Sequence, residues 1–143
     1  MLYCDTSTLA KYYVPEPETN AVRSRLDAED RVMAAELARV ELMGVFHRRF
    51  REGKWTPEYF RAVARQFQQD EIDRLWTWIP LESSILKLAS ETYLTLSATL
   101  SLRSADCIHL SSARHHGAAE LYTHDLHQAE ACAAMGLKAL SIR

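Results

Sequence analysis

The stretch Leu2-Tyr3-Cys4-Asp5-Thr6-Ser7-Thr8-Leu9 decides the fold. Apolar, strand-like residues at its start run into one acid and three hydroxyl-bearing residues. A buried strand that ends on a carboxylate and turns at once into a helix places that acid at the C-terminal edge of a sheet, where open α/β folds keep their functional sites. We therefore expect Asp5 to be a site residue. The alternative is that Asp5 or Thr6 only caps the following helix, because both residue types favour that position.

The size and composition of the chain predict a single domain over residues 1–143. The 143 residues are 48% hydrophobic and 25% charged, which is typical of a globular domain with a full core. No apolar run approaches the length that crosses a bilayer, and the N-terminus lacks the charged and apolar regions of a signal peptide. We therefore expect a cytoplasmic protein without membrane association.

The charge and the cysteine content bear on nucleic-acid binding, disulfide bonds and structural zinc. The formal net charge of −2 does not indicate a nucleic-acid binder, because such proteins usually carry a basic patch. A local patch suited to phosphates nevertheless follows His47 and consists of Arg48, Arg49, Arg51 and Lys54. A solvated helix end that complements the helix dipole is the alternative. The three cysteines are far apart without a CxxC pair, which argues against a disulfide framework or a structural zinc site.

Periodicity and capping signals predict strands and helices in alternation. After a first helix that carries Leu9 and Tyr12, helices are predicted at 19–30, 35–52, 57–76, 83–98, 104–116 and 125–135. Further strands are predicted at 31–34, 78–81, 120–123 and 137–142. Strands separated by helices pair in parallel through right-handed crossovers. The pattern therefore predicts an α/β sandwich with helices on both faces of a parallel sheet.

Glu41 is the acid that is hardest to explain as an ordinary surface residue. On the predicted 35–52 helix its neighbours one turn away include Leu37 and Val45, so it lies on an apolar stripe. A lone carboxylate there is costly unless it is paired or bound to a metal. A buried salt bridge, or a helix rotation that exposes the side chain, is the alternative.

Two more acids, Asp106 and Asp125, stand at predicted helix starts. The helix dipole favours a carboxylate such as Asp106 in the first turn of any helix. Asp125 follows the 120–123 strand and precedes Gln128 by three residues, which also fits a capping box. Parallel strands end on the same edge of a sheet, so we expect these acids to converge with Asp5 there.

Such a cluster of oxygen ligands favours a hard divalent cation, Mg²⁺ or Mn²⁺. Carboxylates that converge repel one another unless a cation lies among them. The chemistry that such a site serves best is phosphodiester hydrolysis, in which the metal activates water and neutralises the charge that develops on phosphorus. A histidine site at His124 and His127, or at the His115-His116 pair, competes with this reading. His109 is a candidate for positioning substrate.

In the stretches that carry Asp5, Glu41, Asp106 and Asp125, the chain resembles the PIN-domain nucleases, and it is most similar to the VapC toxins of prokaryotic toxin–antitoxin pairs. The stretch 2–9 is similar to the opening motif of the family, with Asp5 as its first acid. The other motifs are matched by Ala38-Arg39-Val40-Glu41-Leu42, Arg103-Ser104-Ala105-Asp106-Cys107-Ile108-His109 and Leu121-Tyr122-Thr123-His124-Asp125. Each motif is short, but their order and spacing cover essentially the whole chain.

The resemblance implies a three-layer α/β/α PIN-like sandwich with a central parallel sheet of about four to five strands. It also implies a Mg²⁺- or Mn²⁺-dependent endoribonuclease that acts as a toxin, is neutralised by a VapB-like antitoxin protein and forms a homodimer. The site residues that carry over are Asp5, Glu41 and Asp106 as metal ligands, Asp125 as a fourth and more variable acid, and Ser7 and Thr123 as hydroxyls that orient ligands. Cys4 departs from the family pattern, which more often has an aliphatic residue there.

Two other functions compete with the nuclease. One is an RNA- or protein-binding module in which the acids are residual. The other is a haloacid-dehalogenase-like phosphatase, which normally needs a second Asp where this chain has Ser7. A surplus of apolar residues on the first helix (Leu9, Tyr12, Tyr13) and on the helices between 35 and 76 favours a groove for an amphipathic antitoxin segment. Core or dimer packing is the alternative use of these residues.

Overall fold

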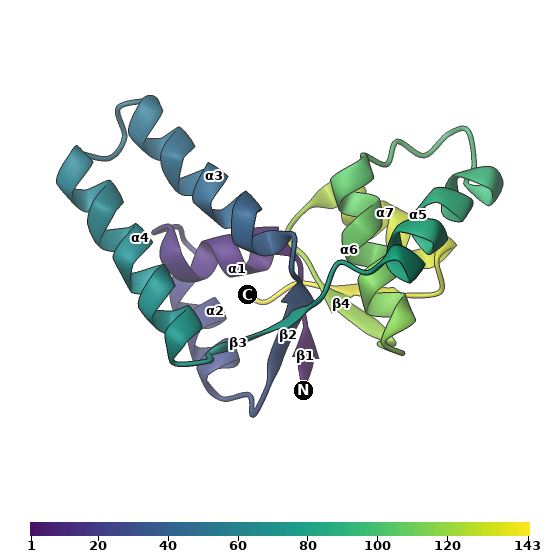
Figure 1. Ribbon diagram of the computed structural model, residues 1–143, viewed down its shortest axis with the longest axis horizontal. Helices are drawn as coiled ribbons and strands as arrows, with labels where there is room; N and C mark the ends of the chain where they lie inside the picture. The colour runs from purple at the N-terminus through teal and green to yellow at the C-terminus, as the bar shows by residue number, and fades with distance from the viewer.

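The computed structural model describes residues 1–143, and strands and helices alternate along it (Figure 1). The strands are β1 (Leu2–Tyr3), β2 (Val32–Ala35), β3 (Trp76–Ile79), β4 (Glu120–Tyr122) and β5 (Lys138–Leu140). The helices are α1 (Thr6–Tyr13), α2 (Thr19–Asp27), α3 (Ala38–Arg51), α4 (Pro57–Ile72), α5 (Ser83–Thr95), α6 (Ser104–His115) and α7 (Leu126–Ala134). None of these helices is both long and apolar enough to span a membrane.

All the strand pairs are parallel. β2 lies between β1 and β3 in a three-stranded sheet, and β4 pairs with β5 in a two-stranded sheet. A parallel bridge between Cys4 and Tyr122 joins the two, so the strands follow the order β3-β2-β1-β4-β5. This confirms the predicted parallel sheet. The junction of β1 and β4 is the switch point at which open α/β sheets form a crevice.

Alternation of side chains along the strands builds two cores, one on each face. Leu2 and Cys4 face the first core and Tyr3 the second, and β2 divides in the same way between Val32 and Met33. Helices α1 to α4 cover the first face, and α5 to α7 cover the second (Figure 1). The predicted three-layer α/β/α sandwich is confirmed. Both cores share these strands.

Tyr13 lies at the centre of the first core. Its ring centroid is 5.6 Å from that of Phe46, 5.4 Å from that of Phe67 and 6.2 Å from that of Trp76, all in edge-to-face arrangements. Leu9 is fully buried in the same core. The apolar surplus predicted for a groove on the first helix is therefore core packing for these two residues of α1.

The boundaries differ from the prediction at the end of α4, which ends at Ile72 and not at 76, and around β2 and β3. Ala35 belongs to β2 and not to the following helix, and β3 begins at Trp76, two residues before the predicted strand. The cause is pairing, because the register from Val32↔Trp76 to Ala35↔Ile79 uses all four residues of each strand. The turn before β3 depends on Arg74 with a φ of 58°, a left-handed conformation that its sequence does not signal.

Candidate active site

Asp5 follows β1 directly, and its side chain is enclosed, with only 2% of the residue exposed. Its Oδ1 accepts hydrogen bonds from the Ser7 hydroxyl at 2.7 Å and from the Thr8 backbone N–H at 3.1 Å. Its Oδ2 accepts one from the Thr123 hydroxyl at 2.5 Å. Burial raises the pKa of Asp5, although these hydrogen bonds act to lower it. The carboxylate also caps α1, so the cap and the site share one side chain.

Thr123 and Asp125 extend β4 toward Asp5. The Thr123 hydroxyl accepts a hydrogen bond from the Asp125 N–H at 3.0 Å while it donates to Asp5. Asp125 caps α7 by accepting from the Gln128 N–H at 3.0 Å. The predicted capping box is only half formed, because the Gln128 amide Nε2 donates instead to the Asp106 backbone and side chain at 3.3 and 3.4 Å. Gln128 therefore links Asp106 with Asp125.

Glu41 reaches the site from the first turn of α3. Its Oε1 accepts a hydrogen bond from the Thr6 hydroxyl at 2.7 Å and contacts Nε2 of His109. Burial acts to raise the pKa of Glu41, but the bonds from His109 and Thr6 outweigh it, and the net shift is downward. His109 is only 1% exposed, so it holds Glu41 and is not placed to meet substrate.

The orientation of α3 explains why Glu41 is only partly buried. Its side chain is 30% exposed, although the sequence places it on an apolar stripe. The residues of α3 that are fully enclosed are Ala38, Leu42 and Phe46. Both alternatives to a lone buried carboxylate are therefore found together. The rotation of α3 leaves the Glu41 side chain partly exposed, and its carboxylate is paired with His109.

Asp106 lies in the first turn of α6, as predicted, and its side chain is 11% exposed. Nε of Arg103 donates a hydrogen bond to its Oδ2 at 3.0 Å. Nη2 of the same guanidinium is 3.8 Å from Oδ2 of Asp125. A single arginine therefore spans two acids that come from different elements.

A cleft of about 380 Å³ opens beside these groups. It is lined by Thr6, Glu41, Gly44, Val45, Arg48, Arg103, Ala105 and Asp106. Of the basic patch predicted after His47, only Arg48 lines this cleft. Arg49 instead donates to Glu16 at 3.1 Å. The patch is thus divided between the site and the packing of neighbouring helices.

The donor set of this edge fits a hard divalent cation, because it offers carboxylate oxygens. As the side chains stand, no group of three or more His, Cys, Asp or Glu residues is arranged to hold a metal ion. Arg103 and His109 pair with the acids instead. The histidine alternative gains no support, since the His124 ring contacts the Thr8 hydroxyl at 3.2 Å and the Ile142 carbonyl at 2.9 Å.

The six predicted site residues meet at one edge of the sheet through a chain of contacts: Asp5, Ser7, Glu41, Asp106, Thr123 and Asp125. Sequence reasoning missed three residues that connect them, namely Thr6, Arg103 and Gln128. A hydroxyl directly after Asp5 and an arginine three residues before Asp106 were the available signals. Neither signal indicates which distant partner the side chain meets.

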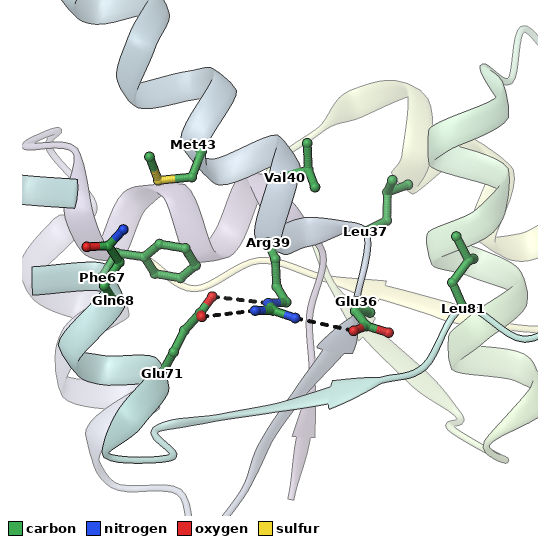
Figure 2. Close-up of a pocket in the computed structure, with 9 residues that line it drawn as sticks. All are labelled: Glu36, Leu37, Arg39, Val40, Met43, Phe67, Gln68, Glu71 and Leu81. Atoms are coloured by element: carbon green, nitrogen blue, oxygen red, sulfur yellow. Dashed lines mark hydrogen bonds and ion pairs between the residues drawn. The ribbon is translucent and has the colours of Figure 1, made fainter. Parts of the chain in front are cut away.

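A larger hollow than this cleft lies between α3, α4 and the end of β3 (Figure 2). This groove has a volume of about 700 Å³. It is lined by Leu37, Val40, Met43, Phe67 and Leu81 together with Glu36, Arg39, Gln68 and Glu71. Figure 2 shows Arg39 held between Glu36 and Glu71, with each of its hydrogen bonds at 3.3 Å. Val40 is 73% exposed, so the groove presents an apolar surface on the helix that carries Glu41.

The fold and its edge of acids define an α/β protein with a carboxylate site at the sheet's switch point. The family model described as PIN domain matches residues 2–134. Ribonuclease VapC47 of Mycobacterium tuberculosis (strain CDC 1551 / Oshkosh) is 34% identical over 117 residues, which are 79% of this chain and 74% of that protein. This chain therefore belongs to the PIN domain family.

Solved structures share the same fold. FitAcB from Neisseria gonorrhoeae superposes with a TM-score of 0.75 at 15% identity, over 98% of this chain and 96% of that one. VapC20 of Mycobacterium tuberculosis, a Sarcin-Ricin loop cleaving toxin, superposes with a TM-score of 0.70 at 15% identity, over 92% and 95% of the two chains. At this level of identity the likeness concerns the fold alone.

Proposed function

We propose that the protein is a Mg²⁺- or Mn²⁺-dependent endoribonuclease that acts in the cytoplasm as the toxin of a toxin–antitoxin pair. The observation that carries the proposal is the set of four carboxylates, Asp5, Glu41, Asp106 and Asp125, which shared partners connect at one edge of the sheet. Glu41 and Asp106 line the polar cleft there. The curated relative VapC47 supports the substrate class, since it is a ribonuclease.

Each residue of the site has a proposed role. Asp5, Glu41 and Asp106 are ligands of the cation, and Asp125 is a fourth acid. A bound divalent cation supplies Lewis acidity at the phosphate and lowers the pKa of the attacking water. The hydroxyls of Ser7 and Thr123 hold the Asp5 carboxylate in a fixed orientation.

Arg48 is proposed to contact the RNA backbone. It lines the cleft without any ion pair to the acids, and a guanidinium binds phosphate oxygens through its planar fork. The net charge of −2 makes such local contacts more important than the overall charge for holding RNA.

Incubation of the purified protein with total RNA tests the enzyme. Cleavage is expected with Mg²⁺ or Mn²⁺ and not with EDTA, and D106N should be inactive while it remains folded. If the folded wild type cuts no RNA with any divalent ion, the proposal is wrong. A binding module would instead retain RNA binding and growth arrest after D5A and D106A, and a phosphatase would turn over a phosphate monoester.

The groove between α3 and α4 is proposed to receive an amphipathic segment of the antitoxin. Its apolar lining and the exposed Val40 suit the apolar face of such a segment. Co-expression with the open reading frame next to this gene should yield a complex by size exclusion, and V40D should abolish it. L94D is the matched control, since Leu94 is 84% exposed on α5 and does not line the groove.

The same experiment addresses the proposed homodimer. If V40D converts a dimer into a monomer and still binds the antitoxin, the groove is the interface between two copies of the chain. If neither property changes, the groove has neither role.

A further inference from the structure

Arg103 and Gln128 divide the oxygens of Asp106 and Asp125 between them. Gln128 serves Oδ1 of both acids, because its side-chain Nε2 donates to Asp106 at 3.4 Å and its backbone N–H donates to Asp125 at 3.0 Å. Arg103 serves Oδ2 of both, with Nε 3.0 Å from Asp106 and Nη2 3.8 Å from Asp125. The Oδ2 atoms of Asp106 and Asp125, which Gln128 does not contact, are therefore the two oxygens nearest the guanidinium.

The two partners of the acids differ in how firmly they are held. Gln128 lies on α7 and is buried, with only 1% of the residue exposed. The Arg103 side chain is 73% exposed and makes no hydrogen bond other than the one to Asp106. Exposed ion pairs of this kind are weak because water screens them and because the long side chain loses freedom. Arg103 is therefore held much less firmly than Gln128.

Arg103 is also not needed to start α6. It occupies the N-cap position, but its side chain makes no capping hydrogen bond. Its reach across to Asp125 on another element thus has no role in forming the helix. What it does supply is one positive charge between two carboxylates that repel each other in its absence.

We propose that Arg103 is a resident counter-ion that holds Asp106 and Asp125 together before the divalent cation binds, and that it must withdraw for the cation to bind. This inference rests on the proposed function, which makes these acids cation ligands. A cation held by Asp106 and Asp125 would compete with the guanidinium for the Oδ2 atoms that Arg103 contacts. Arg103 therefore lowers the affinity of the site for the cation, while its charge offsets the repulsion between the two carboxylates.

Calorimetric titration of the intact protein with Mn²⁺ tests this directly. R103Q should bind Mn²⁺ roughly three- to tenfold more tightly than wild type, because a weak ion pair no longer competes. R103K should lie between the two, since the ammonium keeps the charge but loses the fork that spans two acids. In EDTA, R103Q should have a lower Tm than wild type, and circular dichroism should confirm that it is folded.

R48Q is the matched control, because it removes the same charge from the same cleft without touching either acid. Its Mn²⁺ affinity should stay within about twofold of wild type, as expected for a screened charge without direct contact. Equal tightening in R48Q and R103Q, or no tightening in R103Q, would overturn the role of Arg103 while leaving the nuclease intact. Absence of Mn²⁺ binding in every protein, wild type included, would overturn the proposed function itself.

Discussion

Glu41 of α3 and His109 of α6 are 68 residues apart in the sequence and in direct contact in the structure, Oε1 against Nε2. The Thr6 hydroxyl donates to the same Glu41 oxygen and also contacts the same imidazole nitrogen. A carboxylate that lines the cleft is thus held by groups from α1 and α6. These two contacts fix the orientation of the Glu41 carboxylate, as groups that hydrogen-bond to a metal ligand do in metal sites.

Glu41→Gln separates the structural use of this carboxylate from its proposed use as a ligand. In EDTA it should lower the free energy of unfolding by about 1 kcal/mol, because two hydrogen bonds to a charged group become bonds to a neutral amide. Mn²⁺ should raise the Tm of wild type and raise that of the variant much less. RNA cleavage should be lost.

Thermal unfolding with EDTA and with excess Mn²⁺ measures these effects, with E91Q on α5 as the control at an exposed glutamate. Equal Mn²⁺ shifts in wild type and E41Q, together with retained cleavage, would remove Glu41 from the site. The acid cluster would then consist of Asp5, Asp106 and Asp125.

Asp5→Asn and Asp5→Ala should differ in stability and agree in activity. Both should abolish cleavage. In the absence of metal, D5N should keep or raise stability, because asparagine preserves the cap of α1 and removes a buried charge. D5A loses the cap and should cost about 1–2 kcal/mol. Urea denaturation in EDTA checks the difference, and wild-type cleavage by D5N would contradict the assignment.

Thr123→Val removes a hydroxyl that links Asp5 with the backbone at Asp125 and preserves the shape of the side chain. Loss of a group that orients a ligand typically reduces metal affinity or activity by about 10–100-fold, and we expect a reduction of that size here. T123S keeps the hydroxyl and should retain most of the activity. Mn²⁺ titration and cleavage rates measure both, and equal values for T123V and T123S would show that the hydroxyl has no such role.

Tyr13→Phe tests the polar centre of the first core. The Tyr13 hydroxyl donates to Asp70 at 2.7 Å and accepts from the Trp76 indole N–H at 2.7 Å. Because both partners are buried, the loss should cost about 1–3 kcal/mol. Tyr12→Phe removes a hydroxyl that bonds to Asp27 at the surface and should change stability by less than about 0.5 kcal/mol. Urea denaturation that gives equal changes would contradict this account of the core.

Much of the site was predictable because its residues occupy positions with a local signature. Asp5 and Asp125 each follow a strand and cap the next helix, and parallel strands bring such positions to one edge. Asp106 stands in the first turn of a helix for the same local reason. The partners of these acids were not predictable. Gln128, for example, looks like half of a capping box, and its amide turns instead to Asp106.

The sequence by itself determined the order of strands and helices, the parallel pairing and the edge on which the acids gather, because hydrophobic period and capping chemistry act between neighbours in the chain. Tertiary structure alone decided the rotation of α3 that brings Glu41 into contact with His109, and the reach of Arg103 across to Asp125. Both depend on how helices pack over the sheet. The packing of a helix on a sheet depends on how all the side chains of the two surfaces fit together, so no short stretch of sequence predicts it.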